Sequence, residues 1–203
     1  MTVIDRDCFA TLEFELNWES EFARHRERYL GRKVNIWRDF FPPGLEEGLL
    51  GLGMGENTKM QYEPGEALHK YREKNILTLP FNMFHPTRQG KTKFNPCLGR
   101  FYPKGFLSGL TCIYSNNYFP FRVVGLKPEW LLADLNHPMS GFPFSISVYV
   151  HNAAIKDSDV GGSSTDWLEE ITNLGPGMQA RYQGTKTYFN LNEPLSRPNE
   201  EDD

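Results

Sequence analysis

The sequence predicts an α+β protein that is mainly β, in which an antiparallel sheet packs against one short helix and a second, small β domain is inserted. Three observations support this prediction. Apolar residues alternate over 8–16 and again over 142–151, which is typical of half-buried strands. Leucines recur at three- and four-residue spacing within 43–50, which indicates a short helix. From about residue 70 the chain becomes dense in aromatic residues and proline, so a region of different composition begins there.

The two alternating segments are predicted to belong to one sheet. Each presents its apolar side chains on a single face: Leu12, Phe14 and Leu16 in the first, and Phe144, Ile146, Val148 and Val150 in the second. A further strand over 58–64 ends at the turn Pro64-Gly65. The charged stretch over 17–37 is irregular, and we expect a loop or short helix there that ends in a strand near Val34–Trp37.

The glycine-rich stretch "GLEEGLLGLGMGE" at 44–56 raises the question of a phosphate-binding loop. Pro42 and Pro43 suit the first turn of a helix, where a missing N–H costs little. The glycines at 51, 53 and 55 follow that helix, where the backbone needs positive φ. A dinucleotide-binding loop requires the reverse order, with a strand before the glycines and a helix after them. Since a Gly-Lys-Ser/Thr sequence is missing as well, the pattern argues against nucleotide binding.

Composition narrows the class of protein further. The chain has 203 residues, of which 39% are hydrophobic and 14% aromatic, enough for a core. The N-terminal residues include acids, and no apolar run reaches the length of a membrane span; we expect a cytoplasmic protein. Cys8, Cys97 and Cys112 lack a C-x-x-C arrangement and the five histidines are scattered, so we expect neither a metal nor a cofactor. A net charge of −4 gives no support for nucleic-acid binding.

The inserted region and the C-terminal region each leave two interpretations open. The aromatic residues of the insert form either a small β core or a surface that holds apolar segments of other chains. After Asp157 the sequence "DSDVGGSST" predicts a linker, and Asp166 with Glu169 predicts a helix start that "GPG" at 175–177 terminates. The apolar residues of this region would dock onto their own domain or onto a partner: Trp167, Met178, Tyr182, Tyr188 and Phe189.

Two segments resemble the FKBP-type peptidyl-prolyl isomerases. "FPPGLEEGLLGLGMGENTKMQY" at 41–62 is similar to the family's central segment, V-I-x-G-[LW]-E-x-x-L-x-G-M-x-x-G-E. "PFRVVGLKPEWLLADLNHPMSGFPFSISVYV" at 120–150 is similar to V-x-V-D-x-N-H-x-L-A-G-x-x-L-x-F-x-V-x-V of the SlyD branch, in which an insert-in-flap domain interrupts the isomerase domain. The resemblance covers about residues 1–155. It implies a discontinuous FKBP-like domain with a curved antiparallel sheet around the helix at 1–69 and 134–155, a chaperone-like insert at 70–133, and an acidic linker and C-terminal extension at 156–203.

The resemblance also implies a site. The positions that form the isomerase pocket are occupied by Phe14, Pro42, Leu45, Leu68 and Ile146, where relatives have tyrosine, isoleucine, tryptophan, tyrosine and phenylalanine. Pro42 replaces a residue whose main-chain N–H holds the substrate carbonyl, and proline has no such donor. The family's aspartate has no clear counterpart, with Glu19, Glu21 and Asp39 nearby. In the insert, the aromatic residues implied to bind substrate are Phe81, Phe84, Phe106, Tyr114, Tyr118 and Phe119.

Two functions follow from the resemblance. The first is a SlyD-like prolyl isomerase with chaperone activity, whose partners are unfolded or proline-containing polypeptides. The alternative is a catalytically weak or inactive FKBP-fold chaperone or adaptor that binds polypeptides, which the replacements Pro42 and Leu68 favour. His137 matches the family, and we expect it to be a turn histidine bonded to backbone. The family's Cys- and His-rich tail is missing from the sequence, so nickel binding is not carried over.

Overall fold

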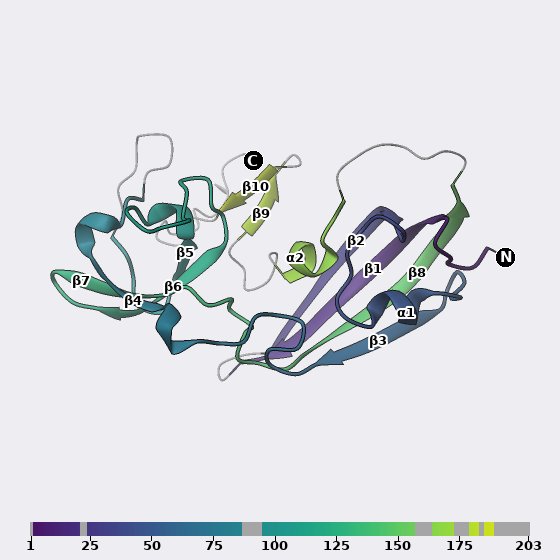
Figure 1. Ribbon diagram of the computed structural model, residues 1–203, viewed down its shortest axis with the longest axis horizontal. Coiled ribbons are helices and arrows are strands. Elements are labelled where there is room, and N and C mark those ends of the chain that lie inside the picture. The colour runs from purple at the N-terminus through teal and green to yellow at the C-terminus, as the bar shows by residue number, and fades with distance from the viewer. Residues whose placement is uncertain are drawn as a thin grey trace, which may run out of the picture. The chain divides into compact units, whose positions relative to one another are not determined.

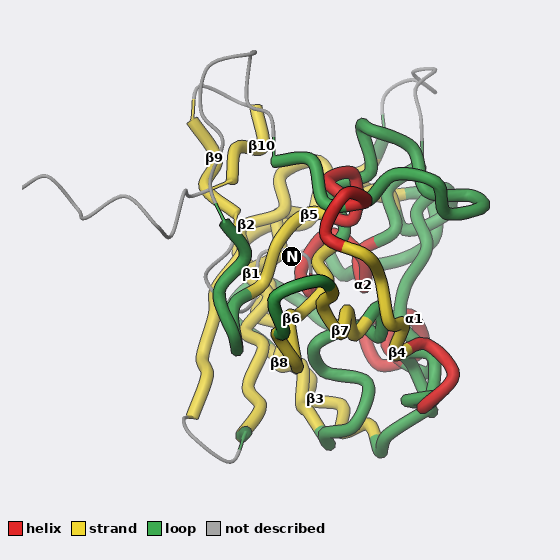
Figure 2. Tube along the Cα trace, turned by 90° about the vertical axis from the view of Figure 1, so that its left-hand side faces the viewer, coloured by secondary structure: helices red, strands yellow, loops and turns green. Residues whose placement is uncertain are grey.

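The chain forms two compact units, each built on a four-stranded antiparallel sheet (Figure 1). Residues Met1–Tyr71 and Met139–Pro176 make up the first unit, and Arg72–Pro138 with Gly177–Asp203 make up the second. The prediction of a mainly β protein is confirmed, since helices are few and short (Figure 2). This computed structural model describes residues 2–20, 24–86, 95–156, 164–172, 179–182 and 185–188.

The sheet of the first unit has the strand order β2-β1-β8-β3. Its strands are β1 (Cys8–Glu19), β2 (Arg24–Asn35), β3 (Asn57–Tyr62) and β8 (Phe144–Ile155). The alternating segments predicted as strands are therefore confirmed as β1 and β8, and they pair with each other at the centre of the sheet. The predicted strand before Pro64-Gly65 is confirmed as β3, which pairs with the other side of β8.

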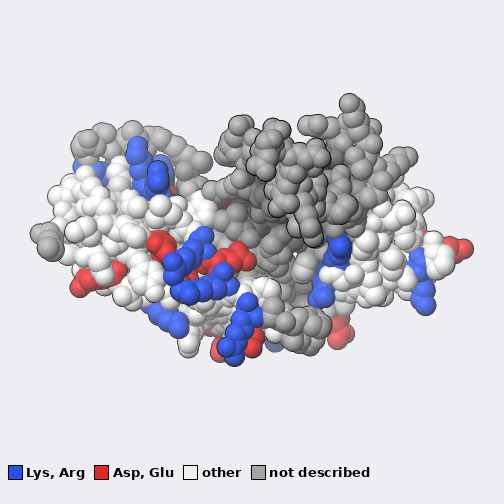
Figure 3. Space-filling view, turned by 180° about the vertical axis from the view of Figure 1, so that it is seen from behind, with Lys and Arg blue, Asp and Glu red and all other residues white. Residues whose placement is uncertain are grey.

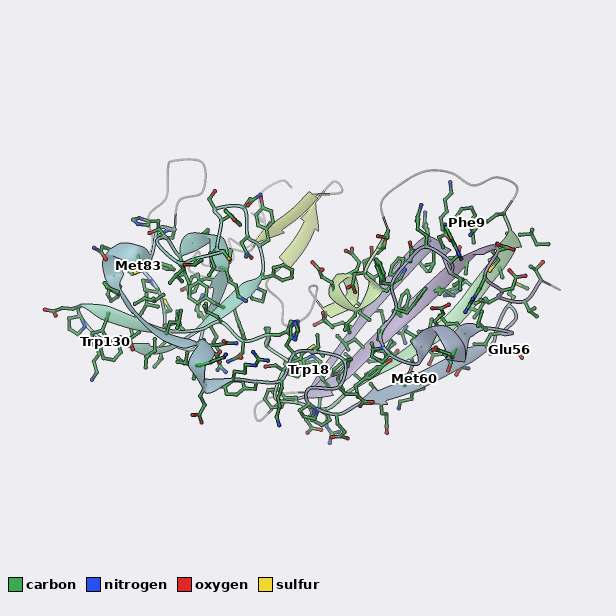
Figure 4. All side chains as sticks on the ribbon, in the orientation of Figure 1. Phe9, Trp18, Glu56, Met60, Met83 and Trp130 are labelled. Carbon is green, nitrogen blue, oxygen red and sulfur yellow. The ribbon has the colours of Figure 1, made fainter. Side chains whose placement is uncertain are left out.

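One face of this sheet is apolar, and we call it the inner face. Cross-strand partners place Phe14 beside Val148, Leu16 beside Ile146 and Trp18 beside Phe144. These side chains are all buried in one core. In Figure 4, Trp18 lies at one end of β1, and Met60 lies on β3 below the helix α1. The alternation seen in the sequence therefore sets which side chains form this core, because successive residues of a strand point to opposite faces.

The prediction for residues 17–33 was wrong, because residues 24–35 form the strand β2, antiparallel to β1. The expected strand near Val34–Trp37 begins ten residues earlier and stops at Asn35, and Trp37 is exposed in the following turn. The edge position of β2 leaves charged residues in solvent. Moreover, Lys33 has a φ of 57°, and the pairing with β1 is irregular there. Polar composition and this bulge together obscure the period of two.

The outer face of the sheet carries charged residues where β1 and β2 pair. The carboxylate of Glu15 accepts hydrogen bonds from Arg26 at 2.6 Å and from Arg28 at 3.0 Å, and the bond from Arg26 lowers the pKa of Glu15 to about 2. Arg28 and His151 also reach the carboxylate of Glu13, at 3.5 and 2.9 Å. Acidic and basic side chains lie next to one another in Figure 3, so charge on this face is balanced locally.

The predicted helix at 43–50 is confirmed as α1 (Leu45–Leu49), which buries Leu45 and Leu49 against the inner face. Gly44, just before it, has a φ of 76°. Gly51 and Gly55 adopt positive φ as predicted. Gly53 does not, because it lies in a short bridge with Val3.

The second unit has the strand order β4-β7-β6-β5. Its elements are η1 (Glu73–Asn75), β4 (Ile76–Pro80), η2 (Phe81–Met83), β5 (Phe101–Pro103), η3 (Lys104–Phe106), β6 (Pro120–Leu126) and β7 (Trp130–Asp134). The insert therefore has its own core, which includes Phe84, Tyr102, Phe121 and Leu131. Two further strands, β9 (Gln179–Tyr182) and β10 (Thr185–Tyr188), pair antiparallel.

The helix predicted at Asp166 is confirmed as α2 (Trp167–Thr172). The side chain of Asp166 accepts a hydrogen bond from the N–H of Glu169 at 3.0 Å, as the D-x-x-E pattern predicts. Trp167 and Ile171 are buried in the core of the first unit, so this part of the C-terminal region docks onto its own domain. The predicted linker, the "GPG" stop, Met178 and Phe189 lie largely outside the described residues.

Two findings bear on the expectations from composition. Cys8, Cys97 and Cys112 form no disulfide with one another. Among the residues that the structure describes, no helix is long and apolar enough to cross a membrane.

Candidate functional site

The five residues assigned to an isomerase pocket all belong to the first unit. Phe14 and Ile146 lie on the inner face, and Leu45 lies on α1; their side chains are buried. Leu68 is partly buried and packs against the same core. Pro42 is also buried and directly precedes the turn into α1. The fold thus brings Phe14, Leu45, Leu68 and Ile146 to one apolar core.

Main-chain groups near Pro42 are used to start the helix. The carbonyl of Pro42 accepts a hydrogen bond from the N–H of Leu45 at 3.0 Å, and the carbonyl of Pro43 accepts one from the hydroxyl of Tyr62 at 3.0 Å. Neither proline can donate through its nitrogen. The backbone at residues 42 and 43 therefore offers no N–H to a substrate carbonyl.

The aromatic ring of Phe14 is covered by a residue that the pocket assignment did not include. Trp167 stacks on Phe14 with ring centroids 5.0 Å apart and planes inclined by 15°. It also contacts Tyr29 on β2, with centroids 6.0 Å apart. On the same strand, a Cβ atom at Gly31 would approach the indole ring to 2.8 Å, so glycine is needed there for the ring to fit. Trp167 is only 5% exposed.

The indole nitrogen of Trp167 also has a hydrogen-bond partner. Its Nε1–H donates to the carboxylate of Asp39 at 3.0 Å. The same carboxylate accepts from the N–H of Thr165 at 3.3 Å and of Asn35 at 3.0 Å, and from Nε of Arg38 at 3.4 Å. Asp39 is buried, and buried carboxylates need such donors because they have lost water.

Main-chain hydrogen bonds hold residues 165–167 beside Phe40. The N–H of Phe40 donates to the carbonyl of Thr165 at 2.8 Å, and the carbonyl of Phe40 accepts from the N–H of Trp167 at 2.9 Å. This is a short parallel bridge, with Phe40 opposite Asp166. One turn further on, the hydroxyl of Tyr29 donates to the carboxylate of Glu170 at 3.0 Å. We call Phe14, Tyr29, Gly31, Asp39 and Phe40 together the Trp167 site.

The inner face also carries one acidic side chain. Glu27 on β2 pairs with Leu16, so its side chain points to the same face as that leucine. Burial raises the pKa of Glu27 to about 7. Among the described residues, none forms a hydrogen bond or ion pair with its carboxylate. Of the acids that could correspond to the family's aspartate, Asp39 is buried, Glu19 is exposed and Glu21 lies outside the described residues.

The six aromatic residues assigned to substrate binding divide into two groups in the second unit. Phe84 is buried in the core, and Phe81 and Phe106 are partly buried; the rings of Phe84 and Phe106 meet edge to face at 6.2 Å. The other three are exposed, and we call them the aromatic loop: Tyr114 at 70%, Tyr118 at 52% and Phe119 at 39%.

The aromatic loop is held on η3 by its backbone. The N–H groups of Lys104 and Gly105 donate to the carbonyls of Phe119 and Asn117, at 2.7 and 2.8 Å. The chain approaches Gly105 so closely that a Cβ atom there would lie 2.5 Å from the carbonyl oxygen of Ser115. A fixed backbone with exposed rings is suited to binding apolar segments.

His137 follows β7 in the second unit. Burial and the nearby charge of Lys104 lower the pKa of His137 to about 4, so its imidazole is neutral at pH 7. Burial likewise lowers the pKa of Lys104.

The amides of the glycine-rich stretch are engaged within the protein. Gly51 donates to the carbonyl of Ile4 and Gly55 to the carbonyl of Val150, both at 2.8 Å. Gly53 donates to the carboxylate of Glu56 at 2.6 Å. These bonds tie the turn to the sheet and to the N-terminal residues, so these three amides are already used within the protein.

Sequence reasoning named Trp167 but did not place it at the site, and it did not name Glu27. The D-x-x-E pattern identified α2, while the contact between Trp167 and Phe14 joins residues too far apart in sequence for periodicity to reveal. For Glu27, the signal was its position in a strand whose alternation was not recognised. Comparison of the sequence with models of known protein families and with curated proteins finds no match.

Proposed function

We propose that this protein is a SlyD-like, FKBP-type peptidyl-prolyl isomerase with chaperone activity, which binds unfolded, proline-containing polypeptides. The observation that carries the polypeptide-binding part is the aromatic loop, where three aromatic side chains are exposed on a backbone held by hydrogen bonds. The two-unit organisation supports the comparison with the SlyD branch, because residues Arg72–Pro138 of the second unit lie between β3 and β8 of the first in the sequence.

The chemistry proposed for the first unit requires no covalent step. Rotation about a prolyl bond has a barrier of about 20 kcal/mol, because the amide loses resonance as it twists, and spontaneous exchange takes about 10–100 s. An apolar surface that removes water from the bond and fits the twisted form lowers this barrier. Phe14, Leu45, Leu68 and Ile146 are the residues proposed for that surface, and substrate can reach Phe14 only when Trp167 no longer covers its ring.

A second candidate function is a chaperone or adaptor of the same fold with little or no isomerase activity. Two observations favour it. Pro42 has no N–H to hold a substrate carbonyl, and Trp167 is stacked on Phe14, one of the assigned pocket residues.

Refolding of a test protein limited by prolyl isomerisation separates the two functions. The proposed isomerase accelerates the slow phase and also suppresses aggregation of the same protein, whereas the chaperone suppresses aggregation only. A chain that does neither contradicts both functions.

A variant of the aromatic loop tests the role of the second unit. We expect Tyr114→Ser, Tyr118→Ser and Phe119→Ser combined to lose aggregation suppression, because these rings are exposed. Leu126→Ser is the matched control, since Leu126 is also exposed on the second unit and lies at the opposite end of β6 from Phe119. Equal losses in both variants would contradict the assignment of the loop.

A further inference from the structure

The contacts of Trp167 have the character of peptide recognition. The main chain of residues 165–167 pairs with Phe40 through two hydrogen bonds, and such bonds do not depend on the side chains of the bound segment. The tryptophan then serves as an anchor, with its ring on Phe14 and its N–H on Asp39. Main-chain bonds next to a pocket for one side chain are a known mode of peptide binding.

The segment that occupies the site, residues 164–172, is short and contacts few elements of the first unit. The helix α2 has six residues, and Asp166, just before it, forms a single bridge with Phe40. Asp166 and, on the helix, Glu169 are exposed, so the contacts come mainly from Trp167, Leu168 and Ile171. Segments held by few buried contacts open at lower free energy than core strands such as β1 and β8.

We propose that the Trp167 site is a peptide-binding site for a polypeptide segment bearing a tryptophan, and that residues 164–172 are its internal ligand. A bound polypeptide displaces this segment, which uncovers the ring of Phe14. The identity of that polypeptide as a folding substrate rests on the proposed function. The existence of a displaceable internal ligand does not rest on that function.

The direct test adds the segment to the full-length protein as a separate peptide. The probe is a fluorescent peptide with the sequence STDWLEEIT, residues 164–172, and binding is followed by anisotropy. We expect the Trp167→Ala variant to bind it at least tenfold more tightly than the unaltered protein, in which the internal segment competes. A peptide with alanine in place of tryptophan should not bind. The control is Trp37→Ala, because Trp37 is 69% exposed and lies outside the site.

A second variant displaces the ring without removing it. In Gly31→Ala, the new methyl group would approach the Trp167 ring to 2.8 Å and the Val34 side chain to 2.9 Å, so the indole must move. We expect this variant also to bind the peptide more tightly than the unaltered protein. A folded Trp167→Ala or Gly31→Ala protein without peptide binding overturns the proposal.

Hydrogen exchange in the unaltered protein decides the question even if both variants fail to fold. The N–H groups of Phe40 and Trp167 should exchange through local opening, at least 100-fold faster than those of Leu16 and Ile146 at the centre of the sheet. Equal protection of both pairs would show that the segment opens only when the whole unit unfolds, and would overturn the proposal.

The same variants separate this proposal from the proposed function. If Trp167→Ala binds the peptide and also accelerates proline-limited refolding beyond the unaltered protein, both proposals are supported. Peptide binding without any acceleration contradicts isomerisation and leaves the internal ligand established. Equal acceleration by the variant and the unaltered protein, with no peptide binding, supports isomerisation and overturns the internal ligand.

Discussion

At the scale of single residues, Glu27 makes the first unit sensitive to pH. Its carboxyl has a pKa of about 7 in the folded protein because of burial, well above the usual 4.5. The folded state therefore holds this proton more tightly than the unfolded state. The resulting stabilisation is complete below pH 4.5 and is lost as the pH rises through 7.

We expect Glu27→Gln to remove this dependence, because an amide of similar shape has no proton to lose. The variant should match the unaltered protein in free energy of unfolding at pH 4 and exceed it by about 1–2 kcal/mol at pH 8. Urea titrations of the two proteins at pH 4 and at pH 8 measure these free energies of unfolding. Glu47→Gln, on the exposed side of α1, shows what the loss of one acidic charge does by itself. An equal effect of Glu27→Gln at both pH values would argue that burial of the charge is not the cause.

At the scale of elements, Gly105 sets how closely the aromatic loop approaches η3. In Gly105→Ala, the added Cβ would lie 2.5 Å from the carbonyl oxygen of Ser115 and 3.0 Å from that of Asn117. Because both contacts are with backbone, the loop must move. We expect a loss of about 1–3 kcal/mol in stability together with weaker suppression of aggregation. The control is Gly141→Ala, since a Cβ at Gly141 meets nothing within 4 Å. Unchanged aggregation suppression in Gly105→Ala would show that the loop does not need this backbone position.

At the scale of the whole molecule, Asn136 connects the two ends of Arg72–Pro138, the part of the second unit inserted into the first. Its Oδ1 accepts from the N–H of Arg72 and from Nδ2 of Asn75, both at 3.0 Å. Its Nδ2 donates to the carbonyl of Arg72 at 3.0 Å and to the carboxylate of Asp134 at 2.7 Å. Asn136 is buried, so the loss of its amide leaves partners without bonds.

We expect Asn136→Ala to destabilise the second unit by about 2–3 kcal/mol and to leave the first unit nearly unchanged. Hydrogen exchange can show this, since amides of the β4–β7 pair should exchange faster while those of the β1–β8 pair keep their rates. Asn75→Ala is the graded control, as it removes one of the four bonds. If both sheets lose protection together in Asn136→Ala, the two units are a single cooperative structure.

The parts of the fold that were predictable are those specified by local pattern. The alternation in β1 and β8, the leucines of α1 and the D-x-x-E start of α2 depend on residues close together in sequence, and all were confirmed. Most of β2 was missed, and only a strand near Val34–Trp37 was predicted, because its outward side chains are charged and a bulge interrupts its period. In the candidate site, Phe14 and Trp167 were both named from the sequence. Their contact could not be predicted, because the two residues lie far apart in the sequence of the first unit. Such long-range packing follows from the tertiary structure and has no local signal.

The position of β8 has a consequence for the order in which the units can form during synthesis. Both β1 and β3 pair with β8, which the ribosome produces only after β4 to β7, the strands of the four-stranded sheet in the second unit, are complete. Domains usually fold as they emerge, the earlier before the later. Here residues Arg72–Pro138 of the second unit can fold first, while the edge of β1 that pairs with β8 is still unpaired. The part of the chain proposed to bind unfolded polypeptides is thus available before the remainder of its own protein has folded.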